Sequence, residues 1–163
     1  MKAKILFISM IMLSCQAQKV EIFQCEEEVC LQLRNHDDAS VPWWKFWAES
    51  NQSTDIDIYM INSIPVAGFQ CDLNGVKIEK STGGLLEKHG FDASNSANRV
   101  LAFSMQAKTI PVGKGILTTI NLSEPFEEVC MTSIIFAGTG GEKVSTNAPE
   151  CIKSNLEDDG NEK

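Results

Sequence analysis

The chain has 163 residues, which is enough for one domain with a substantial hydrophobic core. Its formal net charge of −8 repels phosphate backbones and argues against nucleic acid as a partner. Because no apolar stretch approaches the ~20 residues needed to cross a bilayer, we expect no transmembrane span.

The first 17 residues have the pattern of an export signal, with two lysines, a short apolar run and small residues at its end. Cleavage after Ala17 would define a signal peptide over residues 1–17. Residues 13–15 also resemble a bacterial lipobox, so that in the alternative residues 1–14 are removed and Cys15 carries a lipid anchor. Both alternatives predict a secreted or cell-envelope protein on the extracellular or periplasmic face.

Aromatic residues are concentrated between residues 42 and 47, which hold all three tryptophans of the chain. In an extended segment Trp43 and Trp47 share one face, and Trp44 and Phe46 share the other. Indole faces stack on sugar rings and peptides, so Trp43, Trp44 and Trp47 are candidate ligand-binding residues. The alternatives are that the segment covers the open end of the domain core, or that it contacts a membrane surface.

Alternation with a period of two dominates the rest of the chain and predicts strands with one buried and one solvated face. Five segments show it: Ile56, Ile58 and Met60; Ala67, Phe69, Cys71 and Leu73; Leu101, Phe103 and Met105; Ile116, Thr118, Ile120 and Leu122; and Thr132, Ile134 and Phe136.

Turn residues separate these strands. Asn74-Gly75 suits a positive φ and predicts a hairpin, and further breaks fall near residues 81–84, 111–115 and 138–141. A short helix is predicted from Leu85 to His89, before a glycine. Several short strands with frequent turns are typical of a β-sandwich.

The order of these motifs resembles that of cohesin-like domains. The motifs are Ile56-Asp57-Ile58-Tyr59, Val66-Ala67-Gly68-Phe69-Gln70, Thr82-Gly83-Gly84, Val100-Leu101-Ala102-Phe103-Ser104 and Ile110-Pro111-Val112-Gly113-Lys114-Gly115-Ile116-Leu117. The resemblance implies an all-β fold over residues 29–152: a jelly-roll β-sandwich of about nine strands with at most one short helix, related to bacterial carbohydrate-binding modules. Residues 18–28 would be a lead-in, and residues 153–163 a disordered acidic tail. Cohesins are non-catalytic and bind dockerin modules in polysaccharide-degrading assemblies.

Five cysteines lie beyond the lipobox, so one should stay free or pair between chains. In the domains that this chain resembles, cysteines at the places of Cys130 and Cys151 are paired, which implies a disulfide here. We predict a second disulfide between Cys25 and Cys30, with Cys71 as a buried free thiol.

Other polar residues suggest no catalytic site, metal or cofactor. Asp55, Asp57 and Asp72 could in principle join carbonyl oxygens around calcium, but there is no complete calcium loop. We instead expect Asp55 and Asp57 on the solvated face of a strand. His36 and His89 fall in no recognisable triad motif.

The sequence therefore predicts an exported, non-catalytic recognition domain whose partner is a protein module or a polysaccharide. The first alternative is a structural or adhesive cell-envelope protein, held by lipid on Cys15. The second is a small hydrolase on a β scaffold.

Overall fold

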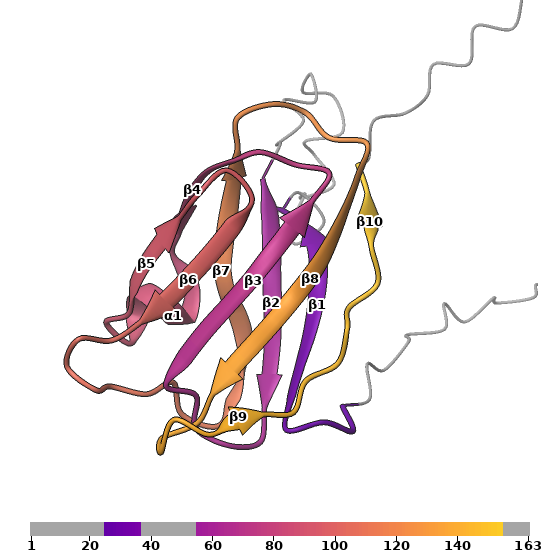
Figure 1. Cartoon of the computed structure of the whole chain (residues 1–163). Coiled ribbons are helices and arrows are strands. Elements are labelled where there is room, and N and C mark those ends of the chain that lie inside the picture. Colours follow the sequence, from indigo (N-terminus) through magenta and orange to yellow (C-terminus); the bar gives the residue numbers. More distant parts are fainter. Residues whose placement is uncertain (1–24, 37–54, 155–163) are drawn as a thin grey trace, which may run out of the picture.

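The computed structural model describes residues 25–36 and 55–154, which form two antiparallel β-sheets packed face to face (Figure 1). The four-stranded sheet has the order β1 (Val29–Asn35), β2 (Ile56–Asn62), β7 (Gly113–Leu122), β4 (Ile78–Thr82). The six-stranded sheet has the order β10 (Ile152–Lys153), β8 (Glu128–Ala137), β3 (Gly68–Asn74), β6 (Arg99–Phe103), β5 (Asp92–Asn95), and β9 (Lys143–Val144) pairs with β8.

This architecture confirms the predicted all-β sandwich with one short helix. Helix α1 (Gly84–Lys88) begins one residue earlier than predicted and is capped by His89, and Gly90 follows with a φ of +69°. The described residues contain ten strands, where about nine were predicted. Two of them, β9 and β10, have only two residues each and are shorter than ordinary strands. None of the described helices is long and apolar enough to cross a membrane.

The core lies between the sheets and is built from the inward-facing positions of each strand. In β2 the predicted set of Ile56, Ile58 and Met60 is fully buried. From the opposite sheet, Phe69 of β3 and Phe136 of β8 pack with ring centroids 4.9 Å apart. Burial of these large side chains supplies most of the stabilisation that a sandwich of this size has.

In β6 the face that is buried differs from the one that the apolar alternation favours. Val100 and Ala102 are fully buried, whereas Leu101, Phe103 and Met105 are 41%, 40% and 79% exposed. The reason is the pairing with β3, because a strand's register decides which of its two faces meets the core. Leu101 and Phe103 therefore point away from the core, and Met105, two residues beyond the end of β6, is exposed as well.

The predicted turn at Asn74-Gly75 is correct, but the predicted hairpin is wrong. Gly75 has a φ of +88°, and a Cβ at this position would lie 2.2 Å from the carbonyl oxygen of Glu128, so glycine is required. The strands on either side, β3 and β4, belong to different sheets. Turn chemistry is local, whereas the pairing partner of a strand is decided by distant segments.

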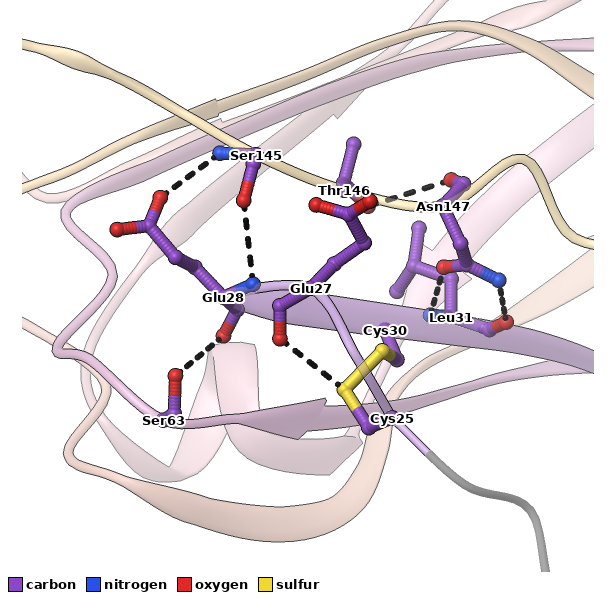
Figure 2. Close-up of a disulfide and its surroundings, with 9 residues drawn as sticks. All are labelled: Cys25, Glu27, Glu28, Cys30, Leu31, Ser63, Ser145, Thr146 and Asn147. Atoms are coloured by element: carbon purple, nitrogen blue, oxygen red, sulfur yellow. Dashed lines mark hydrogen bonds between the residues drawn. A yellow bond between two sulfur atoms is a disulfide. The ribbon is translucent and has the colours of Figure 1, made fainter.

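The edge strand β1 is covered by the chain that follows β9 (Figure 2). The side-chain amide of Asn147 donates to the Leu31 carbonyl at 3.0 Å and accepts from the Leu31 N–H at 2.6 Å. The Val29 N–H donates to the Ser145 carbonyl at 3.1 Å. These bonds occupy backbone groups that an open edge would offer to another strand.

Both disulfides expected from the sequence are present. Cys25–Cys30 joins the segment that precedes β1 to the second residue of that strand, with a Cα–Cα distance of 5.7 Å (Figure 2). Cys130–Cys151 joins β8 to the residue before β10 across a sequence separation of 21, with a Cα–Cα distance of 4.3 Å. The second disulfide therefore ties the end of the described chain to the six-stranded sheet.

The remaining described cysteine, Cys71, is free and fully buried in β3. Burial raises the pKa of its thiol to about 12, and the negative charge of Asp72 contributes in the same direction. Because the thiolate is the reactive form, Cys71 behaves at neutral pH as a small apolar core residue.

Candidate functional site

The outer surface of the six-stranded sheet exposes large apolar side chains. Leu101 and Phe103 of β6 are 41% and 40% exposed, and Ile135 of β8 is 45% exposed. Strand β3 runs between β6 and β8 and contributes Gly68 and Gln70. We call the surface formed by Gly68, Gln70, Leu101, Phe103 and Ile135 the apolar face.

Strand register places these residues in two adjacent rows across the sheet. Gln70 lies opposite both Leu101 and Ile135, and Gly68 lies opposite both Phe103 and Ala137. A Cβ at Gly68 would touch that of Ala137 at 3.5 Å, so the glycine leaves the surface between Phe103 and Ala137 without a side chain of its own. A flat apolar surface on a sheet is typical of a contact site for another macromolecule.

Charged residues border the apolar face. Arg99 donates to both carboxylate oxygens of Asp72, with its Nη2 2.8 Å from Oδ2. This hydrogen-bonded pair holds the pKa of the Asp72 carboxyl below its usual value and raises the pKa of the Arg99 guanidinium. At the other end of the rows, Asp92 pairs in register with Phe103, and Lys143 with Ala137.

The outer surface of the four-stranded sheet is polar, and it corrects one prediction. Asp57 was expected on a solvated face but is only 2% exposed. Its Oδ1 accepts a hydrogen bond from Thr119 Oγ1 at 2.6 Å and is bonded to His36 Nδ1 at 3.0 Å. A hydroxyl on the adjacent strand β7 and the His36 ring, directly after the end of β1, therefore allow the carboxylate to be buried on a sheet face that is not part of the core.

Further polar contacts extend this arrangement. Asn121 Nδ2 donates to Asp55 Oδ2 at 2.8 Å, and Thr82 Oγ1 donates to Asn121 Oδ1 at 3.2 Å. The Arg34 guanidinium lies 3.8 Å from the centroid of the Tyr59 ring, a cation–π contact. Side chains on this surface are thus engaged with one another.

The three aspartates considered for calcium are not brought together. Asp57 lies on β2 of the four-stranded sheet and Asp55 directly precedes that strand, whereas Asp72 lies on β3 of the other sheet. Over residues 25–36 and 55–154, no group of three or more His, Cys, Asp and Glu residues could hold a metal ion.

Two predicted sites lie outside the described residues. One is the candidate ligand-binding set of Trp43, Trp44 and Trp47, and the other is the candidate lipidation residue Cys15. Their roles stay predictions. The apolar face was missed by sequence reasoning, although one signal could have indicated it. The run from Val100 to Phe103 is apolar on both alternating faces, and only one of them can meet the core.

No family model matches this sequence, and no curated protein matches it. Three solved structures are similar to it. The non-cellulosomal cohesin from the hyperthermophilic archaeon Archaeoglobus fulgidus has 16% identity and a TM-score of 0.43, over 60% of this chain and 75% of that one.

A chain of the Coh-OlpC–Doc435 complex, a type I cohesin–dockerin complex from Clostridium thermocellum, has 10% identity and a TM-score of 0.48, over 80% of this chain and 94% of that one. A chain of the CaDoc0917–CaCohA2 complex has 15% identity and a TM-score of 0.37, over 60% of this chain and 84% of that one. The similarity is to the cohesin fold, which the sequence motifs also resemble. The ligand of this chain has to be inferred from its own surface.

Proposed function

We propose that this chain is an exported, non-catalytic recognition domain that binds a folded protein module through the apolar face. The observation that supports this is the exposure of Leu101, Phe103 and Ile135 on the outer side of a sheet whose inner side already forms a full core. Exposed apolar side chains gathered on one surface are stabilised when a partner removes them from water.

The chemistry of the face favours a protein over a polysaccharide as its occupant. Leu101 and Ile135 are aliphatic, and aliphatic side chains lack the flat ring that stacks on a sugar. An apolar centre bordered by charged residues is instead the usual composition of a protein–protein interface. The net charge of −8 favours a partner with lysines and arginines around its own apolar patch.

The resemblance of the sequence motifs to cohesins makes a dockerin module the first candidate for this partner. Export is supported by two disulfides, which persist in oxidising compartments, together with the signal-like residues 1–17. The protein would then act on the extracellular or periplasmic face of the cell.

The test is binding of the purified chain to a panel of purified dockerin modules, measured by calorimetry. We expect Leu101→Glu and Ile135→Glu each to weaken binding at least tenfold, because a charge is placed in the centre of the interface. Val112→Glu is the matched control, since Val112 is 59% exposed but lies outside the apolar face. Equal binding by all three variants would place the interface elsewhere, and binding of none of the modules would contradict dockerin recognition.

A polysaccharide ligand is a separate proposal that depends on Trp43, Trp44 and Trp47. We expect replacement of Trp43 and Trp47 by alanine to abolish retention on a glycan array without a large change in melting temperature. Replacement of Trp44 should lower the melting temperature, because we expect this side chain to face the core. If all three replacements lower it alike, the cluster is part of the core.

The alternative of a lipid-anchored envelope protein is tested separately. Incorporation of labelled palmitate into the full chain, and its loss in Cys15→Ala, would support a lipoprotein. Release of a soluble product cleaved after Ala17 would support plain secretion.

A further inference from the structure

The edge of the sandwich formed by β4 and β5 contains a cleft of about 340 Å³ that the proposed function does not use. This edge, at the left of Figure 1, lies opposite the edge formed by β1 and β10. Helix α1 lies beside it. The lining residues that matter here are Lys80, Ser81, Leu86, Glu87, Phe91 and Asp92.

Ser81 is the unusual residue of this cleft. Ser81 is only 8% exposed, and its hydroxyl has no hydrogen-bond partner among the described residues. The neighbouring buried hydroxyl of Thr118, which also lines the cleft, is satisfied because it donates to the Thr82 carbonyl at 3.1 Å. Buried polar groups are nearly always hydrogen-bonded, so the Ser81 hydroxyl has an unused capacity to bind a ligand.

The rest of the lining indicates the chemical class of that ligand. Leu86 and Phe91 provide an apolar wall and are 1% and 7% exposed. Glu87 lies at the exposed rim, and its carboxylate accepts hydrogen bonds from hydroxyl groups. Lys80 and Asp92 are the other charged residues of the lining, so the cleft has charges of both signs and suits a neutral ligand better than an ion. Glu87 uses one oxygen, Oε2, to accept from the Gly83 N–H at 3.0 Å.

The volume of the cleft narrows the chemical class of the ligand further. Ligand pockets commonly measure roughly 300–1,000 Å³, and this cleft of about 340 Å³ is near the lower end. A single ring with apolar C–H faces and hydroxyl groups at its edge matches both the apolar wall and the polar rim.

We propose that the cleft binds one neutral sugar unit, held by a hydrogen bond with the Ser81 hydroxyl. The Ser81 oxygen is shielded from solvent in the unliganded chain. Binding therefore requires the side chain to rotate about χ1 to a staggered position that reaches the cleft, where a ligand hydroxyl would satisfy it. This site is distinct from the apolar face and goes beyond protein recognition. The sugar unit is either a free monosaccharide or the end of a glycan chain, which share the same chemistry.

The unpartnered hydroxyl leads to an unusual expectation for Ser81→Ala. Since the hydroxyl makes no hydrogen bond in the described part of the protein, its removal breaks none, and the melting temperature should stay unchanged or rise. Ligand binding should nevertheless be lost. A residue kept only for packing would show the opposite pattern.

The experiment titrates the full ¹⁵N-labelled chain with glucose, galactose, mannose, xylose and N-acetylglucosamine, and with the corresponding short oligosaccharides, and follows amide shifts by NMR. We expect saturable shifts in residues 80–93 with at least one sugar, and a loss of affinity of at least tenfold in Ser81→Ala. Ser96→Ala, at an exposed position outside the cleft, should bind like the unmodified chain. Ala93→Phe, which puts a ring into the cleft, should abolish binding.

Tighter binding of an oligosaccharide than of its monosaccharide identifies a glycan end, and equal affinities identify a free monosaccharide. Leu101→Glu should leave these titrations unchanged, which separates this site from the apolar face. Saturable shifts in no sugar, or full affinity in both Ser81→Ala and Ala93→Phe, would overturn the proposal.

Discussion

The outer faces of the two sheets differ in how their side chains are accommodated. On the four-stranded sheet, the buried Asp57 carboxylate accepts from Thr119, and Arg34 lies over the ring of Tyr59. On the six-stranded sheet, Leu101 and the other large side chains of the apolar face remain in contact with water. One face is occupied by interactions within the chain, and the other leaves apolar surface for a partner.

This difference reverses the usual association of polar residues with solvent contact and of apolar residues with structure. A polar residue such as Asp57 is structural here because its neighbours satisfy it in a buried place. An apolar residue such as Phe103 is a candidate for function because the core is already closed beneath it. The following substitutions test the contrast, beginning with the largest expected effect.

Phe136 lies in the core directly beneath the apolar face and is fully buried against Phe69. We expect Phe136→Ala to lower the free energy of unfolding by about 4 kcal/mol, because it leaves a large cavity. Phe103→Ala, on the other side of the same sheet, should cost less than about 1 kcal/mol. Urea unfolding followed by fluorescence or circular dichroism gives both values. Similar losses in the two variants would show that Phe103 is structural.

Asp57 is the corresponding test of the polar face. We expect Asp57→Ala to lower the free energy of unfolding by about 2 kcal/mol, because the half-buried Thr119 hydroxyl and the His36 ring lose their hydrogen-bond partner. Asp92→Ala, at an exposed position of β5, is the control and should change stability little. A loss no greater than that of the control would mean that the polar contacts add no stability.

The contact of Arg34 with Tyr59 should have a smaller effect. We expect Arg34→Met, which keeps a long apolar chain but removes the charge, to cost roughly 0.5–1 kcal/mol through the lost cation–π contact. A double-mutant cycle with Tyr59→Leu isolates the pairwise contribution. An interaction energy near zero would show that the cation–π contact between Arg34 and Tyr59 adds no stability.

The smallest effect is expected from the exposed pair of Asp72 and Arg99 beside the apolar face. Arg99 holds the pKa of the Asp72 carboxyl below its usual value, so the pair stabilises the folded state above the unfolded pKa of roughly 3.9. This stabilisation is lost as the pH falls through the lower folded value. Melting curves between pH 7 and pH 2 should show Arg99→Ala slightly less stable at pH 7, with the difference shrinking as the pH falls. A difference that stays constant over this range would assign another role to Arg99.

Much of the fold could be predicted because it depends on local patterns. Alternation identified β2 and β3, and the glycine after His89 marked the end of α1. The pairing of Cys25 with Cys30 followed from their closeness in sequence, and the cohesin-like motifs implied the sandwich and the second disulfide.

The candidate sites could not be predicted in the same way. Alternation shows that the two faces of β6 differ from each other only in side-chain size, since Val100, Leu101, Ala102 and Phe103 are all apolar. Which face is buried depends on pairing with β3, a strand about thirty residues earlier in the chain. The cleft at Ser81 depends on how the edge strands of two different sheets approach each other.

The sequence by itself thus determined the class of fold, the disulfide-bonded character and the positions of the strands and turns, because these follow from side-chain periodicity and from residues near one another in the chain. Only the tertiary structure decided that Leu101 and Phe103 face outward, that Asp57 is buried, and that β3 and β4 belong to different sheets. The physical reason is that sheet order and register come from contacts between distant segments, and a shift of one residue exchanges the two faces of a strand.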